Sequence, residues 1–297
     1  MKICRFNDNR LGLVERDVIF DVSTALDMLP PERWPARPGD ALIANLDIMR
    51  EAMLRARTGA QQFAIGDVTL HSPITRASKI LAAPANYRKH VEQDTSDPGV
   101  DQGVHRRQML GLERPVDTYG LFLKASSSLV GPHEGVTLDW PGEERRFDHE
   151  VEFAVVIGRP ARHVRVEDAF DHVAGYGIGL DITVRGSEER SYRKSADSFA
   201  LFGPWIATPD EIRDPDDTRF WLSINGETRQ QSSTAAITVP IGELIAIASA
   251  IYTLYPGDII MTGTPEGVGP LQAGDRIDAG ADGVGAFASY VYPAARP

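Results

Sequence analysis

Two glutamates, Glu150 and Glu152, stand two residues apart in a segment that alternates like a β-strand, residues 147–157. Side chains of a strand point to alternate faces, so both carboxylates lie on one face, about 7 Å apart at their Cα atoms. A lone pair of this kind usually belongs to a solvated edge strand. Here residues 153–157 are apolar and predict burial, and two buried carboxylates repel each other unless a cation lies between them. The pattern therefore favours a metal site.

A third carboxylate is predicted to join this pair. A glycine-rich apolar strand, residues 175–180, ends at Asp181, which can reach the same ion. Three oxygen donors without a His-Cys cluster nearby in sequence suit Mg²⁺, Mn²⁺ or Ca²⁺ better than Zn²⁺. His149 points to the opposite face of its strand, so we do not count it as a ligand. We interpret it as a partly buried histidine that is hydrogen-bonded to the backbone.

The elements that must position these residues predict a β-dominated α+β fold. Residues 1–70 contain short apolar runs, a proline-rich break and one helical stretch at 41–56, and they predict a small β-rich N-terminal domain. Residues 71–297 are expected to form the larger, catalytic domain. Its helices are expected at 165–173 and 241–254, and its strands at 79–83, 121–124, 147–157, 175–181, 220–224, 258–262 and 286–292.

Composition excludes several classes of partner. Lys plus Arg is 31 and Asp plus Glu is 42, and the net charge of −11 argues against binding to nucleic acid or anionic membranes. The single cysteine, Cys4, cannot form an internal disulfide and is typical of a reducing compartment. The N-terminus lacks the apolar core of a signal peptide, and no run of 18 apolar residues is present. We expect a soluble, cytoplasmic protein.

A long polar segment, residues 92–118, separates two predicted strands. Such a segment is either a disordered insertion or a lid over a site. It follows Asn86-Tyr87-Arg88-Lys89-His90 at the end of a strand, where catalytic residues often lie. We therefore favour a lid, at about residues 86–118. Further along, residues 263–269 lack the ending of a phosphate loop and predict a tight turn whose N–H groups can bind a carboxylate or carbonyl.

Together these residues resemble the fumarylacetoacetate hydrolase family over roughly residues 79–293. The landmarks, all in the family's order, are Asp148-x-Glu150-x-Glu152, Asp181 after a glycine-rich strand, Lys194-x-x-Asp197, Gly203-Pro204-Trp205, Asn225-Gly226, and Pro256-Gly257-Asp258 followed by Gly263-Thr264-Pro265. The resemblance implies a mixed β-sandwich roll, usually homodimeric, that binds Mg²⁺ or Mn²⁺. It implies substrates that are 2-oxo acids or 1,3-dicarbonyl compounds, as in aromatic catabolism.

The resemblance also implies roles for single residues. The metal ligands would be Glu150, Glu152 and Asp181. Lys194 matches the family lysine near the substrate's developing oxyanion, although without the family pattern it would be taken for a surface lysine. The turn at Gly263 and Thr264 resembles the one that holds a substrate carboxylate, and Gln230 matches a position that is often polar in the pocket.

One departure from the family pattern affects the chemistry. The family's lid usually begins Asn-Tyr-x-x-His-x-x-Glu, and this chain has His90 followed by Gln93. Gln93 can orient His90 or a water molecule but cannot accept a proton near neutral pH. Three interpretations remain open: His90 is the base and Gln93 only orients it; the lid is not helical there and Glu92 substitutes; or hydrolysis is absent.

The resulting hypothesis is a metal-dependent hydrolase that cleaves a C–C bond of an acylpyruvate-like 2,4-dioxo acid through an enolate. His90 would deprotonate the attacking water, and Lys194 would stabilise the enolate. The alternative reaction is decarboxylation, hydration or enol–keto isomerisation of a related 2-oxo acid. An alternative of another class is a non-catalytic, metal-dependent binding protein for such acids.

Overall fold

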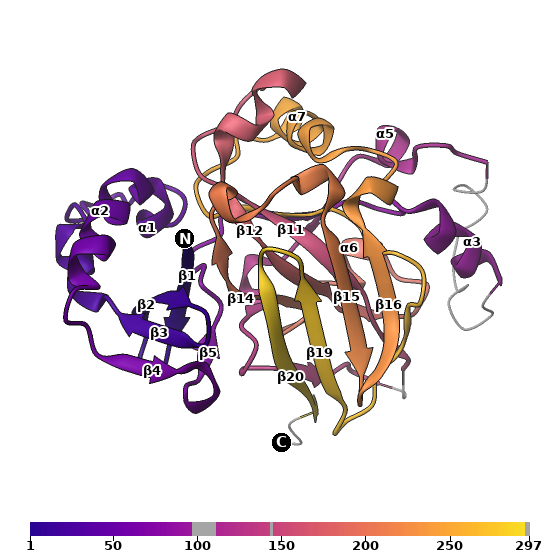
Figure 1. Ribbon diagram of the computed structural model, residues 1–297. Coiled ribbons are helices and arrows are strands. Elements are labelled where there is room, and N and C mark those ends of the chain that lie inside the picture. The colour runs from indigo at the N-terminus through magenta and orange to yellow at the C-terminus, as the bar shows by residue number, and fades with distance from the viewer. Residues whose placement is uncertain (97–110, 143–144, 295–297) are drawn as a thin grey trace.

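The computed structural model describes residues 1–96, 111–142 and 145–294, without the side chains of residues 94–96. It confirms the predicted α+β class with a predominance of strands (Figure 1). The helices are α1 (Ala41–Ala44), α2 (Leu46–Ala56), α3 (Arg88–Ser96), α5 (Pro115–Tyr119), α6 (Arg190–Arg193) and α7 (Ile241–Ile251). Asn45 interrupts the helix predicted at 41–56, and the helix predicted at 165–173 is a 3₁₀ helix, Val166–His172.

The largest sheet in the described part of the chain has twelve strands and runs from the N-terminal residues into the main body. Its main path, in spatial order, is β4 (Gln62–Ala64), β3 (Val18–Asp21), β2 (Arg10–Glu15), β1 (Lys2–Phe6), β14 (Ala200–Ala207), β12 (Val173–Asp181), β11 (Val151–Ile157), β17 (Ile259–Met261), β6 (Ile80–Ala82) and β7 (Phe122–Lys124). Short strands β5 (Leu70–His71) and β8 (Leu129–Val130) pair with β1 and β14.

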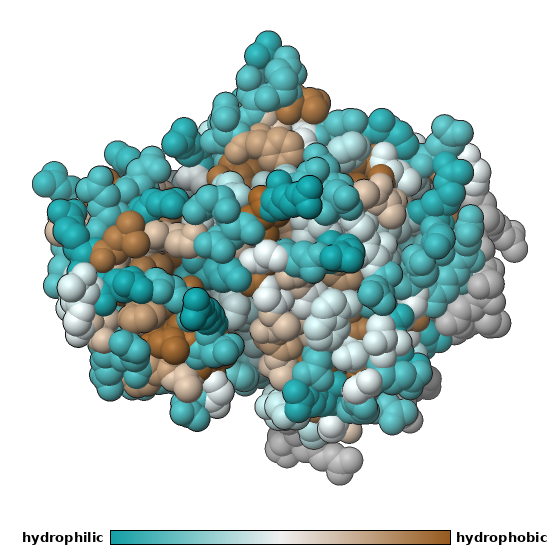
Figure 2. Space-filling model, in the orientation of Figure 1, coloured by the Kyte–Doolittle hydropathy of each residue, from teal (hydrophilic) through white to brown (hydrophobic). Residues whose placement is uncertain are grey.

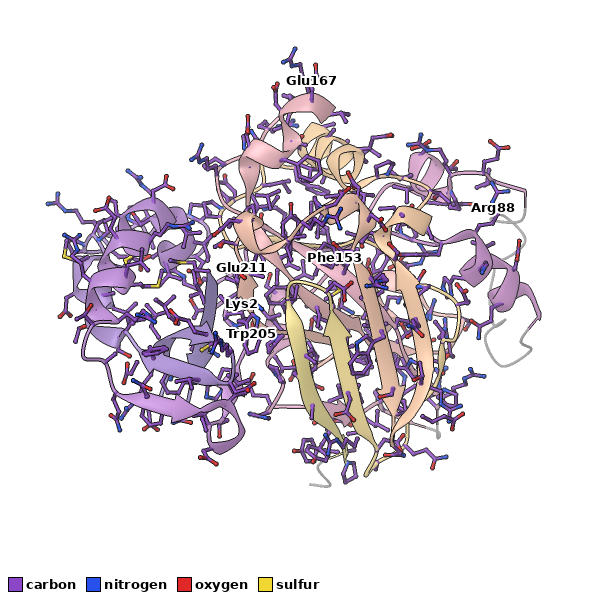
Figure 3. All side chains as sticks on the ribbon, viewed as in Figure 1. Lys2, Arg88, Phe153, Glu167, Trp205 and Glu211 are labelled. Atoms are coloured by element: carbon purple, nitrogen blue, oxygen red, sulfur yellow. The ribbon has the colours of Figure 1, made fainter. Side chains whose placement is uncertain are left out.

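A second sheet packs in front of the first and closes the core (Figure 1). It contains β16 (Glu227–Ser233), β15 (Arg219–Ile224), β19 (Arg276–Ala281), β20 (Gly285–Pro293) and β9 (Val136–Leu138). A small third sheet contains β13 (Thr183–Val184), β10 (Phe147–His149) and β18 (Gly269–Pro270). Figure 3 shows Phe153 of β11 in the interior of this body, and its ring stacks on Tyr176 of β12.

The N-terminal strands lie beside the main body rather than over it, and they join it through the antiparallel pairing of β1 with β14 (Figure 1). At this junction Lys2 lies over the ring of Trp205, 5.9 Å from its centroid (Figure 3). The boundary predicted at residue 70 stays a prediction. Most of the face seen in Figure 2 is hydrophilic, with apolar patches over the N-terminal part. Among the described residues, no helix has the length and apolar character needed to cross a membrane.

The glycines of β12 serve packing. Gly177 and Gly179 lie on the face of the sheet that meets β14 and β17 side chains, and a Cβ at Gly177 would lie 2.5 Å from Cζ of Phe202. The same alternation places Asp181 on that face, together with Glu152 of the neighbouring strand. The absence of side chains at these glycines therefore lets the large sheet pack closely beside the carboxylates.

Candidate metal centre

The structure brings Glu150, Glu152 and Asp181 together. One ligand oxygen from each carboxylate lies within 4.8 Å of the others, and all three residues are buried. The antiparallel pairing of β11 with β12 sets this geometry, because Val151 lies opposite Leu180 and the Asp181 N–H donates to the Glu150 carbonyl at 2.8 Å. Three converging carboxylates are a donor set that fits a hard divalent cation.

The strand predicted at 147–157 is in fact interrupted at Glu150. Residues Phe147–His149 pair with β13 and β18, whereas Val151–Ile157 pair with β12 and β17. Glu150 therefore lies at the point where the chain passes from the small sheet to the large one. The carboxylates of Glu150 and Glu152 still converge, as predicted. The prediction of one continuous strand at 147–157 is wrong.

Two buried lysines hold the carboxylates of the triad. Lys194 Nζ donates to Glu150 Oε2, Asp181 Oδ2 and Thr183 Oγ1, each at 2.6 Å. Lys124 Nζ donates to Asp181 Oδ1 at 2.5 Å and to the backbone carbonyl of Lys194. The interpretation of Lys194 as a surface lysine is excluded by its burial. Lys124 was not predicted from sequence, where its only signal is a charge at the end of an apolar strand.

A buried aspartate and two arginines complete the charge balance. Asp148 accepts from Arg185 Nε and from Arg146 Nε, both at 2.7 Å. Arg185 also donates to Glu150 Oε1 at 3.3 Å, so it links Asp148 to the triad. These residues were not assigned roles from sequence. Four carboxylates thus face four basic side chains, and a bound divalent cation would leave this cluster with two positive charges for an anionic ligand.

The triad carboxylates differ in electrostatic environment. Burial would raise the pKa of Glu150, but the ammonium of Lys194 and the guanidinium of Arg185 outweigh burial and lower it to about 2. Burial and the neighbouring Asp181 raise the pKa of Glu152 well above its usual value. The backbone N–H of Gly263 donates to Glu152 Oε2. A divalent cation would supply the charge that Glu152 needs in order to ionise, which further supports the fit of the site to a metal.

His90 and Gln93 lie on helix α3, at the edge of the main body. His90 is buried, and it lies close enough to Glu150 to interact with it electrostatically. Gln93 Nε2 donates to the Val268 carbonyl at 3.0 Å, and the Gly267 N–H donates to Gln93 Oε1 at 2.6 Å. Because residues 88–96 are helical and Glu92 is exposed, the interpretation in which a non-helical lid lets Glu92 substitute is wrong.

The turn predicted to hold a carboxylate lies directly against the triad. Gly263 has a φ of 108°, and a Cβ there would lie 2.7 Å from the Asn86 side chain, so glycine is required. Gln230 Nε2 donates to Thr264 Oγ1 at 2.8 Å and to the Pro265 carbonyl at 2.9 Å. His149 Nδ1 lies 3.0 Å from Gln230 Oε1, so its partner is this side chain and not the predicted backbone group.

The predicted lid, at about residues 86–118, is described only in part. Residues 97–110 lie outside the described residues, and the lid as a whole therefore stays a prediction. Its described flanks are α3 and α5, and Arg114, just before α5, pairs with Glu243 of α7.

Comparisons with known proteins place these residues in context. A family model described as the C-terminal domain of fumarylacetoacetate (FAA) hydrolase matches residues 79–292. The maleylpyruvate hydrolase of Aquipseudomonas alcaligenes is 45% identical over 285 residues, which cover 96% of this chain and 97% of that protein. A mitochondrial oxaloacetate tautomerase of Rattus norvegicus is 35% identical over 223 residues, which cover 71% of this chain and 65% of that protein.

Among solved structures, the chain is similar to the maleylpyruvate hydrolase from Sphingobium sp. SYK-6 in complex with manganese(II) ion and pyruvate. The TM-score is 0.80 at 38% sequence identity, and the match covers 99% of this chain and 100% of that chain. The likeness extends over the N-terminal strands as well as the main body.

We predict that Mn²⁺ raises the thermal midpoint of the protein, and that it does so more strongly as the pH rises. The raised pKa of Glu152 means that the metal-free folded protein retains a proton, so its stability falls as the pH rises from the unfolded-state pKa of about 4.3 towards the raised value. Metal binding displaces that proton and so restores the lost stability. A metal concentration of about 100 times Kd raises the free energy of unfolding by about 2.7 kcal/mol.

Thermal melts with Mn²⁺ or EDTA at several pH values, together with calorimetric titration, test this prediction. Glu152→Gln should weaken Mn²⁺ binding by about 100-fold or more. Glu167→Gln, which changes an exposed glutamate at the top of the molecule in Figure 3, is the matched control and should bind normally. An unchanged midpoint with EDTA and normal binding by Glu152→Gln would exclude the triad as the metal site.

Proposed function

The chain belongs to the fumarylacetoacetate hydrolase family, and on that premise we propose that it is a metal-dependent hydrolase that cleaves a C–C bond of an acylpyruvate, a 2,4-dioxo acid. The observation that carries the proposal is the buried triad of Glu150, Glu152 and Asp181 with Lys194 bridging two of its members. The likeness to two maleylpyruvate hydrolases along almost the whole chain supports it.

The proposed ligands of the metal are the three triad carboxylates, and we propose Mg²⁺ or Mn²⁺ as the ion. The manganese(II) complex of the Sphingobium relative supports a divalent cation of this kind. A bound ion would act as a Lewis acid for the oxygen atoms of a 2-oxo acid. We further propose that the enzyme is a cytoplasmic homodimer that acts in aromatic catabolism, as expected from the sequence.

The reaction adds water across the bond between C3 and C4 of the substrate. The hydroxyl group goes to the acyl carbon, which leaves as a carboxylic acid, and a proton goes to C3, which gives the 2-oxo acid. In the proposed roles, Thr264 holds the substrate carboxylate, His90 accepts the proton of the attacking water, and Lys194 stabilises the negative charge of the enolate.

The position of Lys194 suits this role. Its ammonium lies 2.6 Å from oxygens of both Glu150 and Asp181 and is buried. A cation in a site with little water interacts strongly with a developing charge, because few solvent dipoles screen it. The Lys124 contact with the Lys194 carbonyl further restrains the position of the chain at Lys194.

A second candidate reaction is enol–keto tautomerisation of a 2-oxo acid, which shares the enolate and needs no attacking water. Two observations favour it: Gln93 replaces the family glutamate that pairs with the histidine, and a relative is an oxaloacetate tautomerase. A non-catalytic binding protein is not proposed, because the named relatives are enzymes and the chain retains Lys194 with the full carboxylate set.

We expect the purified protein with Mn²⁺ to convert an acylpyruvate to a 2-oxo acid and a carboxylic acid. Chromatography of the products measures this conversion. Lys194→Met should lower kcat by about 100-fold or more, because it removes the cation beside the enolate. The same variant should bind Mn²⁺ at least as well as wild type, since an ammonium that competes for two ligand oxygens is gone. Equal loss of Mn²⁺ binding and turnover would show that Lys194 only holds the site together.

Substitution of His90 tests the proposed hydrolysis, and the activities of the wild type separate the two candidate reactions. His90→Ala should lower acylpyruvate hydrolysis by roughly 10²–10⁴-fold while Mn²⁺ binding persists, because a positioned base is lost. Lys89→Ala, at the exposed neighbour in the same helix, is the control and should retain activity. If the wild type tautomerises oxaloacetate but does not hydrolyse any acylpyruvate tested, the tautomerase assignment replaces the hydrolase.

We predict that Gln93→Glu does not improve hydrolysis, although it restores the residue usual in the family. The amide of Gln93 donates to one backbone group and accepts from another, and a carboxylate could only accept. It would face the Val268 carbonyl oxygen, repel it and loosen the contact of α3 with the turn. Steady-state kinetics of this variant should show a lower kcat, and a raised kcat would instead mean that the carboxylate turns towards His90.

A further inference from the structure

The side chain of Gln230, on β16, makes four hydrogen bonds in a site that is almost fully buried. Its Oε1 accepts the Val151 N–H at 3.0 Å and faces His149 Nδ1. Its Nε2 donates to the Pro265 carbonyl and to Thr264 Oγ1. All polar positions of the amide are therefore occupied by protein groups, which argues against direct contact with a substrate.

Two backbone partners fix the orientation of this amide without ambiguity. The Val151 N–H can only donate, so the atom that faces it is the oxygen, and the Pro265 carbonyl can only accept, so the atom that faces it is the nitrogen. Thr264 Oγ1 therefore receives a hydrogen from Gln230, and its own hydroxyl hydrogen must point to another acceptor. By the same reasoning, His149 carries its hydrogen on Nδ1.

The partners of Gln230 also connect two parts of the candidate site. Val151 lies between the proposed ligands Glu150 and Glu152. Thr264 follows Gly263, whose N–H holds the Glu152 carboxylate. The chain Glu152, Gly263, Thr264, Gln230 and Val151 is thus a closed ring of covalent and hydrogen bonds, and Gln230 is the residue that closes it.

We propose that Gln230 is a positioning residue that does not touch the substrate but holds the Thr264 hydroxyl as a hydrogen-bond donor to the carboxylate of a 2-oxo acid. The ring sets the distance between that donor and the carboxylate triad. This inference rests on the proposed function and revises the assignment of Gln230 as a substrate-binding residue. It predicts that Gln230 and Thr264 together favour ligands that carry a carboxylate next to the metal-chelating oxygens.

The test compares two chelating ligands of the Mn²⁺-loaded protein by calorimetric titration: pyruvate, which has the carboxylate, and acetylacetone, which has two chelating oxygens but no carboxylate. Gln230→Met should weaken pyruvate binding by about 10-fold or more, the range for a hydrogen bond to a charged group, and change acetylacetone binding by less than about twofold. Gln231→Met, at the exposed neighbour on the same strand, should change neither.

A double-mutant cycle shows whether Gln230 acts through Thr264. In the Thr264→Val background, Gln230→Met should have almost no further effect on pyruvate binding, because the hydroxyl that it orients is absent. Mn²⁺ binding is measured for each variant, and normal binding shows that the site remains folded. Gln230→Asn, which keeps the amide but shortens the side chain, is included in the same comparison.

The outcomes separate the inference from the proposed function. Equal weakening of pyruvate and acetylacetone binding, or full additivity of the two substitutions, would assign Gln230 a purely structural role and overturn the inference. Wild-type protein that binds Mn²⁺ but hydrolyses no acylpyruvate would overturn the proposed function. Selective loss of pyruvate binding in that case would still support the role of Gln230.

Discussion

Burial of three carboxylates within 4.8 Å of one another is the constraint on which the rest of this structure depends. Such a cluster is strongly unfavourable without positive charge, because desolvation and mutual repulsion both oppose ionisation. The protein answers with two lysines and with an aspartate that holds an arginine against Glu150. These cations do not serve all three carboxylates equally, and Glu152 keeps a raised pKa. The positive charge that Glu152 lacks is the electrostatic basis for a metal at this site.

The sheet topology brings this cluster together from distant segments. Glu152 lies in β11, Asp181 ends the adjacent strand β12, and Glu150 lies just before β11. Lys124, by contrast, comes from β7 at the end of the main path of the same sheet. The interruption at Glu150 passes the chain from the small sheet to the large one. Asp148 and Thr183 thereby lie opposite each other in the small sheet, and each contacts a side chain of the charged cluster. The third sheet, although small, therefore positions Asp148 and Thr183, which contact Arg185 and Lys194 of the charged cluster.

The sequence predicts those parts of the structure that depend on local patterns. Alternation with a period of two is a local property, so the shared face of Glu150 and Glu152 follows from it. The ion pair of Lys124 with Asp181 joins residues 57 positions apart, and no local pattern indicates it. Strand β14 was missed because Pro204 lies inside it, and proline disfavours the interior of a sheet. Gln230 was placed in the pocket by family resemblance, but its partner Val151 is 79 residues away, so its role depends on tertiary structure.

The turn at residues 263–268 relates the two glutamines that sequence alone left without clear roles. Gln230, on strand β16, is hydrogen-bonded to the turn at Thr264. Gln93, on helix α3, is hydrogen-bonded to the turn at Gly267. In both cases the amide accepts a backbone N–H and donates to a backbone carbonyl, which a carboxylate cannot do. A glutamate at position 93 would be compatible with a histidine partner but not with this contact. Because His90 lies one helical turn before Gln93, the contact that excludes a carboxylate also fixes the helix that carries the proposed base against the turn that carries Thr264. In this chain the Gln93 amide joins α3 to the turn at Gly267 and Val268, a pair of hydrogen bonds that a carboxylate at position 93 could not make in full.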